Sequence, residues 1–447
     1  MPKVRTRIAP SPTGYLHIGN ARTALFNFLF ARHQGGTFVL RLEDTDKERS
    51  KKEYADDIFE QFKWLGLAAD ETYIQSEHVE RHRELLHTLV SEDKAYISSE
   101  PAKDDPIKTV EVVRLRNPGR SITFHDLIRG DITFDTTELK DFVIARSIDE
   151  PLYHFAVVAD DGEADITHVI RGEDHISNTP RQILIQEALD LPRPIYAHLP
   201  LIMAPDKTKL SKRKHQTSVK SFRELGFLPE AMTNFMALLG WNPGTPQELF
   251  SMQELIDSFS LENVQKSSAI FDIVKLRWFN REYLNRMGED DFQTEAASRL
   301  AHAGIQESAY AERLLPILRE RIEVWSDIDA MFAKGGELFF ASETPRPDPA
   351  KIPWKGESSD AARKHLEACR AMLEQTPDAF QSAEALKALL WPYADENGRG
   401  SVLWPLRYAL TGADKSPDPF TVAYILGREE TLTRIGTALA RTPIKAQ

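Results

Sequence analysis

The chain has 447 residues, of which 41% are hydrophobic and 28% charged, and its net charge is −12. This length allows two to four domains with substantial cores, and the composition is typical of a soluble globular protein. No apolar run approaches the roughly 18–20 residues of a membrane span, no signal peptide is recognisable, and the single cysteine, Cys369, excludes an internal disulfide. We therefore expect a cytoplasmic protein with no membrane partner and no indiscriminate affinity for nucleic acid.

Strand and helix patterns alternate along the first 95 residues and again between about 166 and 198. Apolar runs predict the strands, and apolar residues at helical spacing predict the helices between them. The expected elements are strand 4–9, helix 20–33, strand 37–42, helix 51–65, helix 77–95, strand 166–171, helix 178–189 and strand 195–198. This alternation is typical of a parallel α/β sheet.

Two other regions have a different character. Residues 97–150 contain short β-like runs between turn residues, which predicts an inserted mixed unit, and after about 220 helical patterns dominate, including 228–239, 252–259 and 270–283. Helix breaks are expected at Pro392, 397–400 and 416–419. The predicted domains are 1–96 and 151–222 for the two halves of the α/β domain, 97–150 for the insertion, and 223–300 and 301–447 for two helical domains.

A rigid turn, PSPTGYLHIGN (10–20), joins the first strand to the first helix. A helix N-terminus presents unpaired N–H groups and a positive dipole end, which attract phosphate. Gly19 would let a nucleotide approach the backbone closely, and His17 could hydrogen-bond a phosphate oxygen. Taken alone, the motif could also be an ordinary strand-to-helix turn that carries a surface histidine.

A second segment, KLSKR (209–213), gathers cations between the last predicted strand and the helical region. Ammonium groups three residues apart could hold the β- and γ-phosphates and neutralise a leaving pyrophosphate. A solvated basic loop is the alternative for this segment alone. The two segments in this order predict an enzyme that uses ATP.

Seven motifs, to which these two segments contribute, resemble those of bacterial-type glutamyl-tRNA synthetases, which are class I aminoacyl-tRNA synthetases. The resemblance covers nearly the whole chain. It implies a Rossmann-like catalytic domain with a mixed α+β insertion, followed by an all-α anticodon-binding region. The motifs are RIAPSPTG (7–14), HIGN (17–20), RLEDTD (41–46), HVIRGEDH (168–175), NTPRQ (178–182), KLSKR (209–213) and PLRYALTG (405–412).

The resemblance also implies roles for individual residues. Arg7 would pair its planar fork with the side-chain carboxylate of glutamate, which lysine would do poorly. The α-amino group would contact Ser11, Glu43 and the backbone of Ala9, and Tyr153 and Arg171 would complete the amino-acid pocket. ATP would contact His17, Gly19, Asn20, Asp174, Lys209, Ser211 and Lys212, of which His17, Lys209 and Lys212 would be catalytic.

The residues alone leave other interpretations open. Glu43 could belong to a helix-capping acidic turn or a weak divalent-metal site. Arg171 could form a structural ion pair, and Tyr153 could simply pack in the core. The acidic residues at 173–174 could be a solvated loop.

Three departures from the family pattern concern ligands. Asn20 replaces the second histidine of the His-Ile-Gly-His consensus, so one imidazole contact to phosphate is missing. Leu210 and Arg213 are variations within the Lys-Met-Ser-Lys-Ser type motif. Some relatives carry a cysteine-rich zinc knuckle in the insertion, whereas this chain has YISSE at 96–100. We therefore expect Mg²⁺ with ATP, but no zinc and no other bound metal.

The implied reaction has two steps and a large partner. The α-carboxylate of L-glutamate attacks the α-phosphorus of ATP, pyrophosphate leaves, and the terminal 2′-OH of tRNA(Glu) then attacks the adenylate. Residues 97–150 would hold the acceptor end, 223–300 the stem, and 301–447 the anticodon of a tRNA bound by a monomeric enzyme. Candidate tRNA contacts are Arg114, Arg116, Arg120, Arg129, Arg399, Trp404, Arg407 and Tyr408.

Four other functions are possible from sequence. A glutaminyl enzyme would share the N-terminal half but have a β-rich anticodon region, and a truncated enzyme that glutamylates a modified tRNA base would lack the tail. A nucleotidylyltransferase would make an adenylate without tRNA. A non-enzymatic tRNA-binding module would not need both phosphate motifs.

Overall fold

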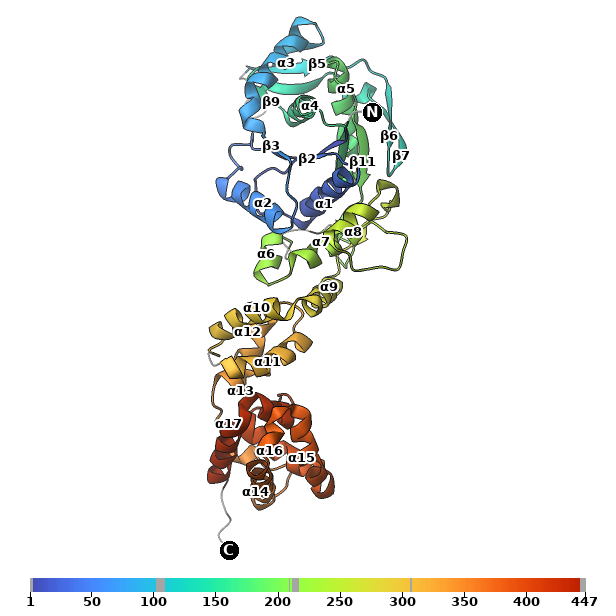
Figure 1. The fold of residues 1–447 in the computed structure, drawn as a ribbon. Coiled ribbons are helices and arrows are strands. Elements are labelled where there is room, and N and C mark those ends of the chain that lie inside the picture. Colours follow the sequence, from blue (N-terminus) through green and yellow to red (C-terminus); the bar gives the residue numbers. More distant parts are fainter. Residues whose placement is uncertain (1–2, 102–108, 209, 211–216, 306–307, 443–447) are drawn as a thin grey trace. The chain divides into compact units, whose positions relative to one another are not determined.

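The computed structural model describes residues 3–101, 109–208, 210, 217–305 and 308–442. The chain divides into two compact units, Met1–Asn280 and Arg281–Gln447 (Figure 1). This division lies about 20 residues before the boundary expected between the two helical domains. The other predicted boundaries fall inside the first unit and stay predictions.

A seven-stranded sheet forms the centre of the first unit. Neighbouring strands pair in parallel throughout, except for the antiparallel pair at one edge. The predicted parallel α/β architecture is therefore confirmed. In spatial order the strands are β3 (Glu71–Ile74), β2 (Thr37–Leu42), β1 (Arg5–Ile8), β10 (His168–Gly172), β11 (Ile195–Leu199), β6 (Ser121–Asp126) and β7 (Gly130–Asp135).

The first helix explains how the sheet is covered. It is buried on nearly all sides because it packs between strands β1, β2 and β10 and the later helices α7 and α8. Its sequence is accordingly apolar around most of its circumference, including Ala21, Leu25 and Phe28. The helices of this unit are α1 (Ile18–His33), α2 (Lys52–Trp64), α3 (Val79–Ser91), α4 (Tyr153–Glu163), α5 (Thr179–Ala188), α6 (Val219–Glu224), α7 (Pro229–Leu238), α8 (Met252–Ser258) and α9 (Ile273–Arg286), which continues past Asn280.

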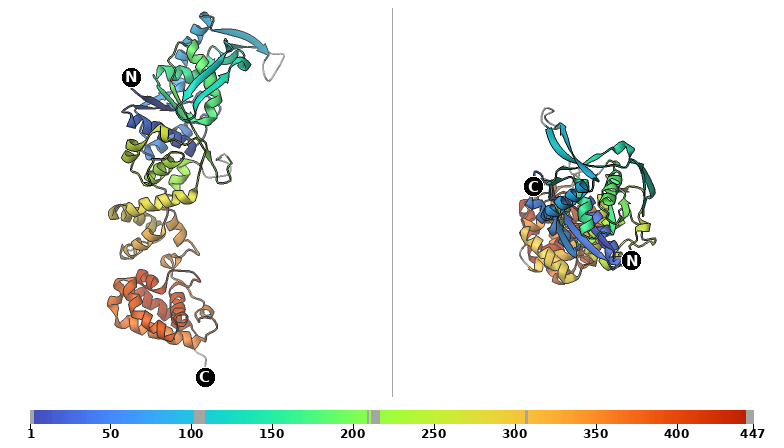
Figure 2. Two further views of the ribbon diagram at one scale, coloured as in Figure 1. Left: turned by 90° about the vertical axis from the view of Figure 1, so that its right-hand side faces the viewer. Right: turned by 90° about the horizontal axis from the view of Figure 1, so that it is seen from above.

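The segment predicted as one insertion contributes to two sheets. Strands β4 (Ala95–Pro101), β5 (Thr109–Leu115), β8 (Phe142–Ser147) and β9 (Glu150–Pro151) form a separate antiparallel sheet, whose β4 and β5 extend away from the body of the unit (Figure 2). Between β5 and β8, the β6–β7 hairpin instead joins the central sheet, where Asp126 of β6 pairs with Tyr196 of β11 (Figure 1). The sequence indicated short β-like runs in this segment but not the pairing of β6 with β11, because that pairing spans about 70 residues.

Three local expectations were wrong. The helix predicted over 77–95 ends at Ser91, because Asp93 takes a left-handed conformation with φ 56° and β4 begins at Ala95. The helix predicted over 270–283 begins at Ile273, since Ala269–Ile270 form strand β13 beside β12 (Ile202–Met203). The break expected at Pro392 does not occur, and α15 runs through it.

The second unit is helical, as predicted, and its described residues contain no strand. Its single cysteine, Cys369, is buried on α14 (Ser359–Gln375), and burial raises the pKa of its thiol to about 12. The helices are α10 (Glu289–His302), α11 (Ser308–Arg321), α12 (Asp327–Phe332), α13 (Phe339–Ser342), α14 (Ser359–Gln375), α15 (Ala383–Asn397), α16 (Arg399–Thr411) and α17 (Pro419–Arg441). Nowhere in the described parts of the chain is a helix both long and apolar enough to span a bilayer.

Candidate active site

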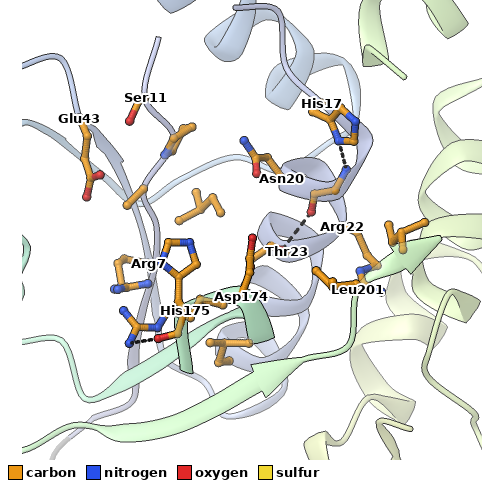
Figure 3. Close-up of a pocket in the computed structure, with 18 of the residues that line it drawn as sticks. Arg7, Ser11, His17, Asn20, Arg22, Thr23, Glu43, Asp174, His175 and Leu201 are labelled. Atoms are coloured by element: carbon orange, nitrogen blue, oxygen red, sulfur yellow. Dashed lines mark hydrogen bonds between the residues drawn. The ribbon is translucent and has the colours of Figure 1, made fainter. Parts of the chain in front are cut away.

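A cavity of about 430 Å³ opens at the carboxyl ends of β1 and β10. The chain leaves these adjacent strands toward opposite sides of the sheet, and open α/β sheets bind ligands at such a point. Figure 3 shows Arg7 and Glu43 on one side of this cavity and His17 and Asn20 on the other. The residues predicted from sequence that line it are Arg7, Ala9, Ser11, His17, Gly19, Asn20, Glu43, Tyr153, Arg171 and Asp174.

The side of the cavity that is predicted to bind the nucleotide is built on the N-terminus of α1. His17 caps the helix, because its Nδ1 accepts the N–H of Gly19 at 3.0 Å. The proton of a neutral imidazole must then reside on Nε2, which leaves Nε2 as a donor. A Cβ at Gly19 would lie only 3.2 Å from His17 Nδ1, so a side chain there would disturb this cap.

Buried charges surround the other side of the cavity. Asp161 accepts hydrogen bonds from Arg7 Nε at 3.1 Å and from Arg41 Nη1, and all three residues are buried. Burial by itself would raise the pKa of Asp161, but the charges of Arg7 and Arg41 outweigh it and hold the pKa below its usual value. Asp161 is therefore an anionic anchor that fixes both guanidinium groups.

Arg171 is held differently from Arg7. Its guanidinium donates to His198 Nε2 at 3.2 Å, Gln182 Oε1 at 2.7 Å and Thr179 Oγ1 at 2.9 Å. No carboxylate among the described residues pairs with it, so the alternative of a structural ion pair is not supported. Burial, and then the charge of Arg7, lowers the pKa of Arg171. A buried cation with neutral partners favours binding of an anion.

Glu43 is a buried acid in the same cavity and carries the opposite charge to Arg171 when it is ionised. It is buried beside Arg41, whose Nη2 donates to Glu43 Oε1 at 3.1 Å. Burial raises the pKa of Glu43 even though the charges of Arg41 and Arg7 act against it. Because Arg41 is shared with Asp161, an additional cation such as an ammonium group would stabilise the Glu43 carboxylate.

Tyr153 and His175 lie next to each other on the rim. The Tyr153 hydroxyl is 3.3 Å from His175 Nδ1, and Asn178 Nδ2 is 3.1 Å from the same atom. Burial, followed by the charge of Arg171, lowers the pKa of His175 to about 4. His175 is thus a neutral polar group in the cavity at pH 7.

Sequence reasoning missed several lining residues, among them Arg22, Thr23 and Leu201. Arg22 could have been found from sequence, because it stands two residues after the HIGN motif. It was missed because it lies on an apolar helix, which did not indicate that its guanidinium reaches the cavity (Figure 3). Nothing in the sequence indicated Leu201, because the contact that holds it is made by its backbone N–H, which donates to Glu173 Oε1.

Lys209, Ser211 and Lys212, with Arg213, lie outside the described residues. The residues around them reach the site: Leu210 lines the cavity, and the Ile18 N–H donates to the Thr217 carbonyl at 2.9 Å. Leu210 and Thr217 therefore lie beside the cavity and beside the first turn of α1, respectively.

The arginines predicted to contact the tRNA acceptor end are all engaged in ion pairs. Each has a carboxylate partner: Glu100 for Arg114, Asp93 for Arg116, Glu187 for Arg120 and Glu173 for Arg129. A phosphate would have to compete with these carboxylates, and the assignment of tRNA contacts stays a prediction.

The anticodon candidates form aromatic–cation groups on α15 and α16. Arg407 lies 4.7 Å from the ring centre of Trp404, which stacks on Tyr408, and Arg399 lies 4.8 Å from that of Trp391. Arg407 also donates to Ser416 Oγ at 2.9 Å, and Arg399 pairs with Asp395 at 2.7 Å. Aromatic rings with adjacent cations suit unstacked bases, although these contacts also stabilise the helices.

A site that binds a metal ion would need several His, Cys, Asp or Glu side chains that lie close together. No group of three or more His, Cys, Asp and Glu side chains in the described ranges is arranged to hold a metal ion. The prediction that no zinc is bound stays a prediction.

Comparison with known proteins places the chain in a family. Residues 3–108 and 99–278 match the model for tRNA synthetases class I (E and Q), catalytic domain, and residues 283–439 match an anticodon binding domain. A glutamate–tRNA ligase of Xanthomonas axonopodis pv. citri is 40% identical, with 98% of each chain covered. The chain belongs to the glutamyl-tRNA synthetase family. Members of this class charge tRNA with an amino acid through an adenylate made from ATP.

Two further similarities agree with this membership. A glutamate–tRNA ligase of Syntrophotalea carbinolica is 39% identical over 99% of both chains. A solved glutamate tRNA ligase from Elizabethkingia meningosepticum, in complex with its amino acid, has a TM-score of 0.86 and 31% identity, and covers 99% of this chain and 100% of its own. The family boundary between 278 and 283 coincides with the division of the compact units.

Proposed function

We propose that this chain attaches L-glutamate to the 3′ end of tRNA(Glu) through a glutamyl-adenylate and releases AMP and pyrophosphate. One observation carries the proposal: a single cavity combines a buried arginine with no carboxylate partner among the described residues, Arg171, a buried carboxylate, Glu43, and the capped N-terminus of a helix at His17. These groups match the side-chain carboxylate, the ammonium group and the nucleotide phosphates, respectively.

The charged residues on the amino-acid side of the cavity would orient the substrate glutamate. The side-chain carboxylate of glutamate would pair with Arg171 and Arg7, with Tyr153 beside them. Its ammonium group would contact Glu43, Ser11 and the carbonyl of Ala9. With both ends fixed, the α-carboxylate is directed across the cavity toward the nucleotide. Orientation of this kind supplies much of the acceleration of a bimolecular reaction.

The nucleotide side stabilises the charge that moves onto pyrophosphate. The backbone N–H groups at the N-terminus of α1 and His17 Nε2 would donate to the phosphate oxygens. Gly19, Asn20 and Asp174 would contact the nucleotide. Lys209 and Lys212, with Ser211, would neutralise the leaving pyrophosphate. Mg²⁺ would arrive bound to ATP as part of the substrate.

The second step involves tRNA. The terminal 2′-OH attacks the mixed anhydride, so the acceptor end must reach the same cavity. Arg116 in the insertion and Arg399 and Arg407 in the second unit are proposed tRNA contacts. We also propose that the enzyme acts as a monomer in the cytoplasm, where its substrates occur.

Aminoacylation of purified tRNA isoacceptors with labelled glutamate tests this function. We expect label on tRNA(Glu) that depends on ATP. Labelling of tRNA(Gln) as well would show a non-discriminating enzyme of the same class. No labelling of any tRNA, in a preparation that forms an adenylate with another substrate, would contradict the proposal and favour a nucleotidylyltransferase.

A further inference from the structure

The turn between β6 and β7, residues 126–130, reaches both sides of the active-site cavity. It belongs to the inserted segment in sequence, but β6 lies beside β11 in the central sheet (Figure 1). Asp126 contacts a histidine that binds Arg171. Arg129 contacts a glutamate that binds the backbone of Leu201. The two connections touch each other, because Arg129 Nε also donates to the His198 carbonyl at 3.4 Å, but their side-chain contacts lead to different sides of the cavity.

The first connection leads to the amino-acid pocket. Asp126 Oδ2 lies 2.6 Å from His198 Nδ1, and both side chains are fully buried. A carboxylate bonded to Nδ1 keeps the imidazole proton there, so Nε2 retains its lone pair. Arg171 donates its Nε–H to this Nε2 at 3.2 Å. Asp126 therefore sets the histidine tautomer that accepts from Arg171.

The electrostatics agree with a neutral His198. Burial lowers the pKa of His198, and the charge of Arg171 lowers it further, while Asp126 opposes the shift. A protonated imidazole would present an N–H to the guanidinium and lose this hydrogen bond. The arrangement holds Arg171 without neutralising its charge, which stays available for a ligand carboxylate.

The second connection leads to the nucleotide side. Arg129 Nη2 pairs with Glu173 Oε2 at 2.6 Å, and Glu173 Oε1 accepts the N–H of Leu201 at 2.9 Å. The carbonyl of the same peptide unit, that of Pro200, accepts from Arg22 Nη2. The Pro200–Leu201 peptide is thus held on both edges.

The Pro200–Leu201 peptide begins a wall of the nucleotide pocket. Leu201 and Ile202 line the cavity, and Ile202 accepts from the N–H of Leu210 within the KLSKR segment. Arg22 also donates to the Leu239 carbonyl at 3.0 Å, so the same cation joins α1 to the end of α7. A shift of the peptide would therefore move this wall.

We propose that the β6–β7 turn is a positioning element for both substrates of the adenylation step. Asp126 acts through His198 on Arg171 and hence on the amino acid, whereas Arg129 acts through Glu173 on Leu201 and hence on ATP. The assignment of substrates to the two sides rests on the function proposed above.

Single substitutions test the two connections one at a time. Asp126 accepts with each oxygen: Oδ1 from the N–H groups of Ile128 and Arg129, and Oδ2 from the N–H and Nδ1 of His198. In Asp126→Asn one of these positions becomes a donor. Arg129→Gln removes the ion pair to Glu173. Asp131→Asn is the matched control, because Asp131 on the same hairpin forms an exposed pair with His125.

Pyrophosphate exchange with saturating tRNA gives the readout, as separate KM values for glutamate and ATP. Loss of the hydrogen-bond partner behind a metal ligand typically costs about 10–100-fold, and we expect a similar range for the partners behind Arg171 and Leu201. We expect Asp126→Asn to raise the KM for glutamate by about tenfold or more and leave that for ATP nearly unchanged. Arg129→Gln should do the reverse, and Asp131→Asn should change neither. Equal changes in both constants, or no change in either, would overturn the proposal.

Variants of His198 keep the test valid if Asp126→Asn does not fold. His198→Gln offers an amide oxygen to Arg171 Nε, whereas His198→Leu offers no acceptor. The glutamine variant should retain more affinity for glutamate than the leucine variant, and equal affinities would count against the first connection. Wild-type exchange that does not depend on glutamate would instead contradict the proposed function, independently of these variants.

Discussion

The two sides of the cavity are built in different ways. The amino-acid side consists of buried charges, Arg7, Arg171 and Glu43, each fixed by hydrogen bonds within the first unit. The nucleotide side uses the first turn of α1, where Asn20 is exposed and His17 half-buried. The groups proposed to bind the amino acid are thus held in place without a ligand, while the groups proposed to neutralise pyrophosphate come from the segment at 209–213. Changes to the groups proposed to neutralise pyrophosphate should affect the rate, and changes on the amino-acid side should affect the affinity for glutamate.

The largest effect is expected on the nucleotide side. Lys212→Ala should reduce adenylate formation by about 10²–10³-fold, because it removes a charge that stabilises the transition state. Single-turnover formation of the adenylate measures the rate, and circular dichroism checks the fold. Normal single-turnover activation would remove Lys212 from the mechanism.

Arg7→Lys tests the amino-acid side. A hydrogen bond between charged groups contributes about 1.5–3 kcal/mol, so losing the planar fork should raise the KM for glutamate about 10–100-fold. The rate at saturating glutamate should change much less. An unchanged response to glutamate would mean that the side-chain carboxylate binds elsewhere.

Asp161→Asn should lower stability as well as affinity. It leaves two buried guanidinium groups, those of Arg7 and Arg41, without their shared anion, which typically costs about 3–5 kcal/mol. Urea denaturation measures the free energy of unfolding of each variant. The exposed pair of Asp46 with Arg49 provides a control, and Asp46→Asn should leave the free energy of unfolding nearly unchanged. Equal stability of the two variants would contradict the role of Asp161 as an anchor.

The smallest effect is a pH dependence of stability. Burial lowers the pKa of both His154 and His175 to about 4. The unfolded chain binds these protons near pH 6.5, whereas the folded protein does not until about pH 4, so stability falls as pH decreases through this window. The melting temperature should be lower at pH 5 than at pH 7, and His154→Gln should reduce the difference. A variant with the full wild-type difference would show that His154 does not contribute.

Local sequence predicted the parts of the site that are local in the chain. The β1–α1 turn with His17 and Gly19, and the strand end at Arg171, follow from apolar periodicity, turn residues and motif chemistry. The Asp126–His198 and Arg129–Glu173 contacts did not, because they depend on β6 pairing with β11 across about 70 residues. Strand β13 was missed for the same reason, since its partner β12 is distant in sequence.

Pyrophosphate exchange with glutamate, with glutamine, or with neither, each with and without tRNA, tests most directly whether the two sides of the cavity act on one adenylate. The glutamyl enzymes that the sequence resembles usually need bound tRNA before they activate glutamate, so we expect exchange only when glutamate and tRNA are both present. Exchange supported equally by glutamine, or proceeding at full rate without tRNA, would contradict the account.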